Sequence, residues 1–161
     1  RAGQGGDMAE RGRRLPVTFT SVIELPVSPA AAWAFVIDRA HEVERMRFEP
    51  RSTQGVGTLN DLRGRVLLVV PVHGVSRTVC WDPPHVCAFE SVTPSWPVRA
   101  RVVERFERAG GGTHHRIDYE VTVTSTIGRV VAPVLTAAMR RSRVRYQHRL
   151  HRALAAISFD S

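Results

Sequence analysis

Apolar and polar side chains alternate near the start of the chain and then change to a helical spacing. Between residues 17 and 25 the apolar side chains fall mostly on odd positions, the pattern of a strand with one buried face. Ser28 and Pro29 follow. A serine can cap a helix, and proline at the first helical position loses no hydrogen bond. We predict a strand over 17–25, a helix from Pro29 to Asp38 and a second short helix over 40–46.

Short runs of valine, leucine and threonine come next, separated by glycine and proline. Short apolar runs separated by glycine and proline are typical of antiparallel strands joined by turns. The runs predict six more strands, near residues 54–60, 65–72, 75–81, 86–92, 97–107 and 113–124. From residue 131 to residue 157 apolar side chains recur at three- and four-residue steps, which predicts one long amphipathic C-terminal helix.

The glycine run at residues 110–112 marks a hairpin whose register can be worked out, because facing residues of an antiparallel pair have a constant index sum. Pairing Phe106 with His115 puts Glu104 opposite Ile117 on one face. The same sum gives these further pairs: Val102 with Tyr119, Ala100 with Val121, Val98 with Val123, and Arg101 with Glu120 as an ion pair.

The turn at residues 82–85 gives a second register by the same arithmetic. The predicted pairs are Trp81 with Val86, Arg77 with Glu90, and Cys80 with Cys87. Two cysteines are too few for a disulfide framework, and a reducing compartment favours thiols. We expect two neighbouring free thiols in the sheet.

The formal net charge is +8, and all 23 basic residues are arginine. A strongly basic chain suggests nucleic acid or an anionic membrane as a binding partner. The arginines are dispersed rather than interleaved with aromatic side chains, apart from a cluster over residues 140–145, so we do not expect a nucleic-acid partner. No apolar run approaches the ~20 residues that span a bilayer, and we expect a cytoplasmic protein.

A chain of 161 residues suits one domain. Residues 1–14 are rich in glycine and charge and are predicted to be a flexible N-terminal arm or a tag remnant, which leaves 15–161 as the domain. The predicted elements form an α+β architecture. A curved seven-stranded antiparallel sheet wraps on the long C-terminal helix, and two short helices follow the first strand.

Several of these landmarks occur in an order known from one superfamily. They are the strand-to-helix opening at 23–38, Gly-Val-Gly-Thr at 55–58, Trp-Asp-Pro-Pro at 81–84, the hairpin at 106–113 and the segment 127–133. Together they resemble the polyketide cyclase/dehydrase and lipid-transfer branch of the START-like (SRPBCC) superfamily. The resemblance implies a helix-grip fold with an apolar cavity that holds a hydrophobic small molecule. No catalytic motif of the superfamily can be carried over residue by residue.

Three residues with useful chemistry fall on the apolar face of the predicted hairpin, namely Glu104, His115 and Tyr119. A carboxyl, an imidazole and a phenol close together can move protons and hold a developing enolate, as an aldol cyclisation with loss of water requires. They are therefore the candidate catalytic residues. A polar cluster whose members only satisfy one another explains the same pattern.

Candidate ligand-binding residues come from the same faces and from the last helix. Arg77 could hold a substrate oxygen, although a surface ion pair with Glu90 explains it as well. Trp96 stands at a strand entrance, where it either gates a pocket or packs in a turn. His148 and His151 have a spacing that a metal can use, but no third ligand is near, so we predict no metal site and no cofactor. The remaining ligand-binding candidates are Val102, Val121, Leu135, Met139, Ser142 and Tyr146.

The residues and the resemblance together favour a protein that binds a hydrophobic, polyketide-like or aromatic small molecule in a central cavity and promotes its cyclisation and dehydration. One alternative is a non-catalytic carrier or sensor of a lipid, quinone or similar apolar ligand. An arginine-rich interaction protein is a third. The expected partner is the small molecule, and the expected state is a monomer or a homodimer.

Overall fold

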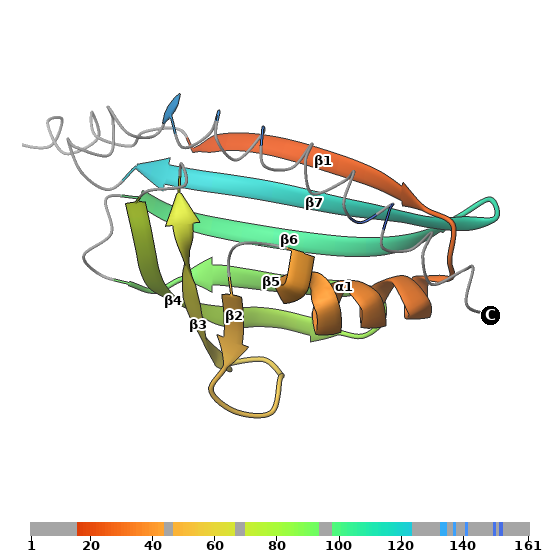
Figure 1. Cartoon of the computed structure of the whole chain (residues 1–161), viewed down its shortest axis with the longest axis horizontal. Helices are drawn as coiled ribbons and strands as arrows, with labels where there is room; N and C mark the ends of the chain where they lie inside the picture. Colours follow the sequence, from red (N-terminus) through yellow and green to blue (C-terminus); the bar gives the residue numbers. More distant parts are fainter. Residues whose placement is uncertain are drawn as a thin grey trace, which may run out of the picture.

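The computed structural model describes residues 16–43, 47–66, 70–93 and 98–123, and six single residues nearer the C-terminus. This part of the chain contains one helix and seven strands. They are β1 (Val17–Leu25), α1 (Pro29–Val43), β2 (Arg47–Pro50), β3 (Leu59–Val66), β4 (Val70–Asp82), β5 (Val86–Ser91), β6 (Val98–Ala109) and β7 (Gly112–Val123). The strands form one antiparallel sheet in the order β1-β7-β6-β5-β4-β3-β2 (Figure 1). The predicted α+β class and seven-stranded sheet are confirmed.

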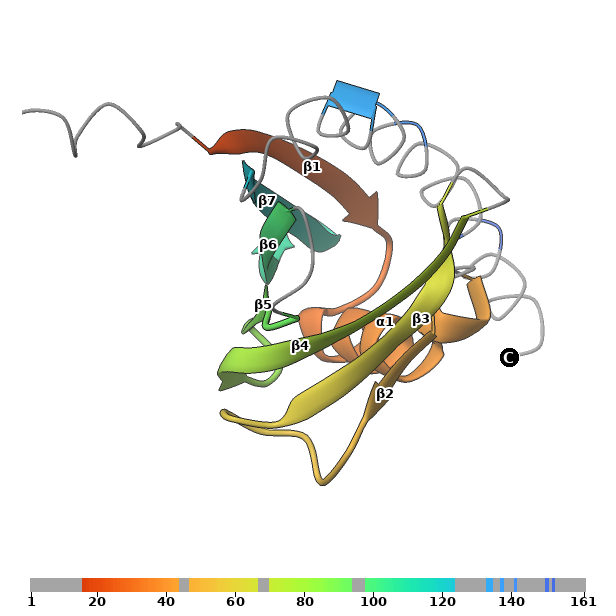
Figure 2. The same ribbon diagram turned by 90° about the vertical axis from the view of Figure 1, so that its left-hand side faces the viewer.

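The sheet is strongly curved (Figure 2). β1 lies at one edge beside β7, and β2 lies at the other edge beside β3. The curvature makes one face of the sheet concave. α1 lies against this concave face and contacts β6, β7 and β2.

The turn from β1 into α1 is built as the sequence predicts. The backbone N–H of Ala31 donates to Ser28 Oγ (3.3 Å) and that of Ala32 donates to Ser28 O (2.8 Å), so Ser28 caps the helix. One helix then continues to Val43, where we expected a first helix ending near Asp38 and a second one after it. Nothing in the sequence interrupts it, because no glycine and no further proline occurs before Val43.

The segment between β2 and β3 differs from the prediction. Residues 51–58 form bends and a turn rather than a strand. The N–H of Gly57 donates to Thr78 O (2.8 Å) and that of Thr58 to Gly55 O (3.1 Å). Gly57 has φ 90°, a left-handed conformation that glycine adopts without steric cost. The hydrophobic pattern does not reveal β2, whose four residues are too few to display a period of two.

β3 and β4 also divide the chain differently from the two strands predicted over 65–72 and 75–81. β3 ends at Val66, and β4 runs unbroken from Val70. Gly74 lies inside β4 and pairs with Leu62. Glycine weakens a strand without ending it when its neighbours are paired, so it is not a strand boundary here.

The β6–β7 hairpin has the register that the index sum predicts. Phe106 faces His115 and Glu104 faces Ile117, and the register of the other predicted pairs of this hairpin is confirmed as well, apart from the ion pair expected between Arg101 and Glu120. Gly112 lies so close to β1 that a Cβ atom would collide with the carbonyl oxygen of Leu25. Only glycine therefore fits at this end of the hairpin.

A β-bulge in β4 changes the second predicted register. Arg77 faces Glu90 as predicted, but the register shifts between Thr78 and Cys80. An extra residue on one strand ends the constant index sum on which the prediction depended. The pairs beyond the bulge are Cys80–Ala88, Trp81–Cys87 and Asp82–Val86, so the predicted Cys80–Cys87 and Trp81–Val86 pairs are wrong. Both cysteines are free thiols.

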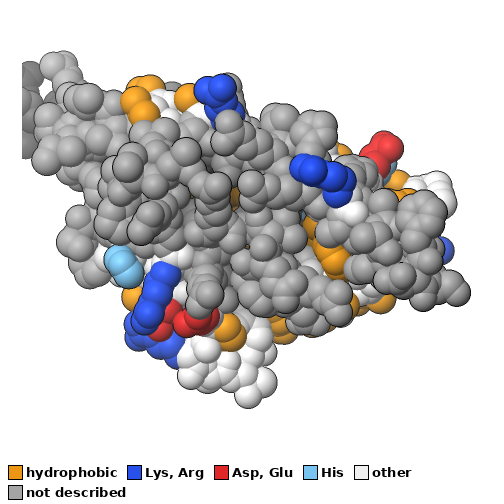
Figure 3. Space-filling model, in the orientation of Figure 1, with side chains coloured by type: hydrophobic (Ala, Val, Ile, Leu, Met, Phe, Trp, Pro, Cys, Tyr) orange, Lys and Arg blue, Asp and Glu red, His pale blue; other side chains and the backbone are white. Residues whose placement is uncertain are grey.

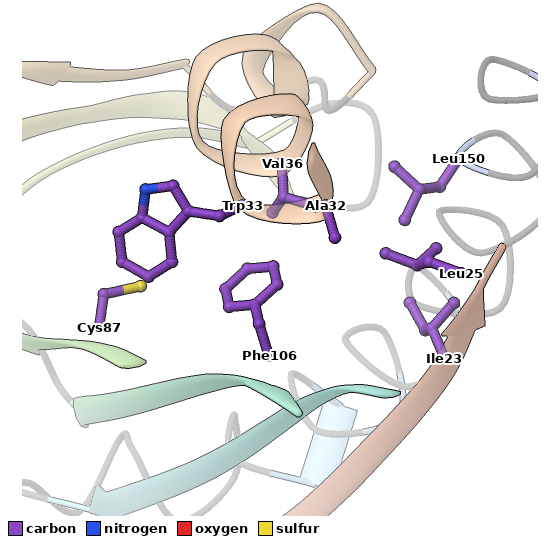
Figure 4. Close-up of a cluster of buried hydrophobic side chains, with 8 residues drawn as sticks. All are labelled: Ile23, Leu25, Ala32, Trp33, Val36, Cys87, Phe106 and Leu150. Atoms are coloured by element: carbon purple, nitrogen blue, oxygen red, sulfur yellow. The ribbon is translucent and has the colours of Figure 1, made fainter. Parts of the chain in front are cut away.

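The hydrophobic core lies where α1 meets the concave face (Figure 4). Trp33 reaches from α1 to the Phe106 ring, with 5.2 Å between centroids and 63° between planes. Leu150 is 0 % exposed and belongs to this cluster, so the C-terminal part of the chain contributes to the core. The cluster consists of Ile23, Leu25, Ala32, Trp33, Val36, Cys87, Phe106 and Leu150.

The opposite, convex face carries charged side chains that pair across strands. Asp118 accepts hydrogen bonds from Thr20 Oγ1 (2.7 Å) and Arg116 Nε (3.0 Å) and forms an ion pair with Arg105. Burial opposes ionisation of Asp118, but these hydrogen bonds and the two arginine charges outweigh it and lower its pKa. The carboxylate therefore holds β1, β6 and β7 together.

Two further ion pairs neutralise arginines of this molecule. Arg101 lies opposite both Glu120 and Glu90, and its ion pair is with Glu90 (Nε to Oε1, 3.5 Å) rather than with Glu120 as predicted. Arg51 donates to both carboxylate oxygens of Asp61 (3.0 and 2.7 Å), and this hydrogen bonding lowers the pKa of Asp61. In Figure 3 basic and acidic side chains gather over the part of the molecule where β3 and β4 lie in Figure 1.

The predicted arm at residues 1–14 lies outside the described residues, as does most of the predicted C-terminal helix. The six described residues of that region have helical backbone, namely Pro133, Val134, Ala137, Arg141, Leu150 and Arg152. Among the described residues, no helix combines the length and the apolar character needed to cross a membrane.

Candidate functional site

The registers arrange residues in rows across the concave face. Glu104, His115 and Tyr119 fall on three neighbouring rows of this face. The rows, starting nearest the β6–β7 turn, are Ile23, His115 and Phe106; then Ser21, Ile117, Glu104, Cys87 and Trp81; then Phe19, Tyr119, Val102, Phe89 and Thr78. The concave face thus carries the three candidate catalytic residues among mainly apolar neighbours.

Glu104 and His115 form a buried pair. Glu104 Oε2 lies 2.8 Å from His115 Nε2. The His115 side chain is 0 % exposed and that of Glu104 is 16 % exposed. The imidazole stacks on the Phe106 ring, with 4.4 Å between centroids and 12° between planes, and this contact fixes the plane of the imidazole. The two side chains meet as the hairpin register predicts, and their role in catalysis stays a prediction.

The hydrogen bond determines where the proton of His115 lies. An ionised Glu104 carboxylate only accepts, so with Glu104 in that form we assign the proton of this hydrogen bond to Nε2. Nδ1 is buried and has no hydrogen-bond partner within the described residues. In the neutral ring this atom holds a lone pair. An imidazole lone pair oriented by a carboxylate on the other nitrogen is the arrangement of a general base with its positioning residue.

Tyr119 lies on the same face, one row away from Glu104. Tyr119 is 7 % exposed, and its ring stacks on Phe19 of β1 with 4.4 Å between centroids and 10° between planes. Diagonal neighbours on a sheet are about 7–8 Å apart. A flat ligand that lies across the rows can therefore contact both Tyr119 and Glu104.

Cys87 faces Glu104 from β5. Burial raises the pKa of its thiol, and the negative charge of Glu104 and the neighbouring Cys80 raise it further. The thiol therefore stays protonated at neutral pH. Since the thiolate is the nucleophile, Cys87 is an apolar wall of the site rather than a reacting group.

We expect iodoacetamide at neutral pH to alkylate Cys80 about tenfold faster than Cys87, or more, because the raised pKa leaves almost no thiolate at Cys87. Peptide mass spectrometry after labelling of the native protein measures both rates. Labelling in denaturant is the control and is expected to make the two rates similar. Equal rates in the native protein would contradict the assignment of Cys87 as a buried thiol.

The predicted ligand-binding residues have different locations. Val102 and Val121 lie on the concave face, and Val121 is 3 % exposed. Arg77 is exposed between the buried Ser76 and Thr78, so it lies on the convex face and does not line the concave one. The surface position agrees with the alternative for Arg77, but the ion pair of Glu90 is with Arg101 and not with Arg77 as that alternative supposed. A role of Arg77 in ligand binding stays a prediction. The other candidates, Trp96, Leu135, Met139, Ser142 and Tyr146, lie outside the described residues, as do His148 and His151.

No group of three or more His, Cys, Asp or Glu side chains that could hold a metal ion occurs within the described ranges.

A cleft of about 890 Å³, which the sequence did not indicate, opens where α1 begins. Phe106 lines this cleft and also stacks on His115, so the same ring borders the cleft and the Glu104–His115 pair. The cleft is lined by residues 28–30 before and in α1, 84–86 of the β4–β5 turn, and 105–108 of β6.

Neither a protein-family model nor a curated protein matches this chain. Solved structures do match it. The Zhui aromatase/cyclase from Streptomyces sp. R1128 superposes with a TM-score of 0.72 at 13 % identity, over 87 % of this chain and 94 % of that one. Ara h 8.0201 gives a TM-score of 0.65 at 13 % identity, over 87 % of this chain and 99 % of that one. The chain has the START-like fold.

A third match is BexL, a di-domain ARO/CYC protein from the BE-7585A biosynthetic pathway. The TM-score is 0.67 at 15 % identity, and 84 % of this chain matches 49 % of BexL. The chain therefore spans about half the length of that relative. At such low identities the likeness concerns the START-like fold, and it confirms the fold that the sequence resemblance implied.

Proposed function

We propose that the chain binds an apolar, polyketide-like molecule against the concave face of its sheet and promotes its cyclisation and dehydration. The observation that carries this proposal is the buried Glu104–His115 pair, whose Nδ1 has no partner among the described residues. Structural neighbours with the same fold are named aromatase/cyclases, which adds support. A free base on an apolar face suits the removal of a proton next to a ketone.

The proposed reaction begins with proton transfer to His115. Nδ1 takes a proton from the carbon between two carbonyl groups, and the enolate that results attacks a second carbonyl carbon of the same chain. A carbon–carbon bond forms, the carbonyl π electrons become an alkoxide, and the proton on Nδ1 passes to that alkoxide. Glu104 stabilises the imidazolium through Nε2 while it exists.

Dehydration uses the same base a second time. His115 removes a proton from the carbon beside the new hydroxyl, the electron pair forms the double bond, and the hydroxyl leaves as water after taking the proton from Nδ1. The Tyr119 phenol is proposed to donate a hydrogen bond to the oxygen on which negative charge develops. These roles make His115 and Tyr119 catalytic residues and Glu104 a positioning residue.

The alternative is a carrier that binds an apolar ligand without changing it. The complete burial of His115 and its stacking on the core residue Phe106 favour this alternative, because such a histidine is also suited to a structural role. In that case the Glu104–His115 pair joins β6 to β7 and does nothing to the ligand.

One experiment separates the two proposals. The protein is incubated with a linear poly-β-ketone thioester, and native mass spectrometry and extraction identify what is bound and what is released. We expect a cyclised product that has lost one water. Recovery of the bound thioester unchanged would support the carrier. Absence of any bound species, together with recovery of only unchanged thioester in solution, would contradict both proposals.

A further inference from the structure

A cluster of uncharged polar side chains is buried on the concave face at the β3–β4 side of the sheet. Asn60 and Thr78 are 0 % exposed, Thr58 is 7 % and Ser76 is 8 % exposed. Asn60 faces Ser76 across the two strands. Thr78 faces Phe89 of β5, which places the cluster on the same face as the Glu104–His115 pair. The general function proposed above does not use these residues.

The hydrogen bonds of the cluster leave an amide oxygen, Asn60 Oδ1, and a hydroxyl oxygen, Ser76 Oγ, without a partner among the described residues. Asn60 Nδ2 donates to Thr58 O (3.2 Å) and to Thr78 Oγ1 (3.0 Å), which uses both of its protons. The carbonyl of Thr58 can only accept, so the orientation of the Asn60 amide is fixed. Asn60 Oδ1 and Ser76 Oγ are buried and have no hydrogen-bond partner among the described residues. Either orientation of Gln54, which bonds to Thr78 Oγ1 (2.9 Å), leaves one further amide atom unpaired.

Unpaired buried polar atoms destabilise a folded protein, so a group of them on one face indicates a partner that fills their hydrogen bonds. The cluster contains no charged side chain, so it does not suit a carboxylate or a phosphate. The Asn60 amide has no proton left to donate, and its free oxygen needs a donor. The complementary group is a neutral hydroxyl, such as a phenol or an enol.

The position of the cluster agrees with a ligand that also reaches the catalytic pair. Thr78 lies on β4 and Glu104 on β6, with β5 between them. Strands are about 4.8 Å apart, so Thr78 is roughly 10 Å from Glu104 across the sheet. Ser76 and Asn60 lie one row beyond Thr78, and Asn60 is also one strand further across, so their unpaired oxygens are roughly 15–20 Å from Glu104 along the sheet. The surface between them is apolar and includes Phe89 and Val102, which face one another. A ligand longer than three fused aromatic rings is needed to contact both groups.

We infer that Asn60 Oδ1 and Ser76 Oγ form a hydroxyl-binding subsite that selects aromatic ligands with a phenolic or enolic O–H at the end away from Glu104 and His115. This inference rests on the proposed function, because it assumes an aromatic ligand on the concave face. It adds the selectivity of the site, for a ligand that carries an O–H rather than an O–CH3 group at that end. The subsite anchors the ligand and takes no part in proton transfer.

Isothermal titration calorimetry with a dihydroxynaphthalene and with its dimethyl ether tests the inference. Both probes are flat and apolar, but the ether has no O–H to donate. We expect the wild-type protein to bind the dihydroxy probe about tenfold more tightly, the value of one well-formed hydrogen bond. Equal affinities would overturn the subsite while leaving the proposed function intact. Failure of both probes to bind would overturn the proposed function and the subsite with it.

Two variants locate the effect. Ser76→Ala removes a hydroxyl that has no partner among the described residues, so it is expected to leave the thermal unfolding midpoint unchanged or raise it. Asn60→Ala also removes two hydrogen bonds and is compared only if it folds. In either variant the tenfold preference is expected to fall toward one, with affinity for the ether unchanged. Ser52→Ala, at an exposed serine, is the control and keeps the preference. A preference that survives in Ser76→Ala and in a folded Asn60→Ala would overturn the inference.

Discussion

His115→Asn is expected to lower kcat for cyclisation of a linear poly-β-ketone thioester by about 10²–10⁴-fold, the range that general acid–base catalysis contributes. Asparagine can still hydrogen-bond to Glu104, but it has no basic nitrogen in place of Nδ1. KM is expected to change little, because the apolar surface that binds the ligand remains. Steady-state kinetics with detection of the dehydrated product measures both constants.

The adjacent residue provides a matched control. His114 lies on the convex face, where its side chain is 44 % exposed and contacts Glu24, so His114→Asn is expected to retain full activity. Glu104→Gln is expected to lower kcat by about 10²-fold or more without raising KM, since the imidazolium loses its carboxylate partner. Glu107→Gln, at an exposed position of β6, is its control. Full activity in both His115→Asn and Glu104→Gln would contradict the assignment of this pair.

Phe106→Ala is expected to lower the free energy of unfolding by about 3–5 kcal/mol, because it empties a large volume in a core that cannot close around it. Phe106 is 1 % exposed and contacts Trp33 at its edge and His115 on its face. A domain of this size has a total stability of about 5–15 kcal/mol, so much of it would be lost. Urea unfolding followed by tryptophan fluorescence measures the change.

A valine on the convex face is the control for this substitution. Val22 is 50 % exposed, and Val22→Ala is expected to change the free energy of unfolding by less than about 0.5 kcal/mol. Phe106→Leu keeps part of the volume and is expected to give an intermediate loss. A loss below about 1 kcal/mol for Phe106→Ala would show that the junction of α1 with the sheet contributes less to the core than its burial indicates.

Local patterns predicted the parts of the fold that depend on neighbours in the chain. The Ser28 cap and the β6–β7 register followed from a short segment and from one index sum, and both are confirmed. That register also places Glu104 and His115 on the same face, where the two side chains are in contact. The stacking of His115 on Phe106 and the unpaired state of Nδ1 could not be predicted, because they depend on side-chain orientation.

The predictions that were wrong concern register and burial, which depend on more than the local pattern of apolar and polar side chains. The bulge in β4 moves Cys80 away from Cys87 by one residue of register, and no motif in the sequence marks it. The polar residues Asn60 and Ser76 belong to a buried face, although polar side chains in an alternating strand indicate the solvent side. Burial of a polar side chain is decided by what packs over it.

The α+β class, the antiparallel strands, the capped helix and the face that carries Glu104, His115 and Tyr119 all follow from the amino-acid sequence. These follow from the period of the side chains and from turn residues, which act over a few positions. The length of α1, the bulge in β4, the convex position of Arg77 and the burial of the Asn60 and Ser76 oxygens became known only from the three-dimensional structure. Each of these depends on contacts between strands and helices far apart in the chain, and the spacing of apolar residues in the sequence does not indicate such contacts.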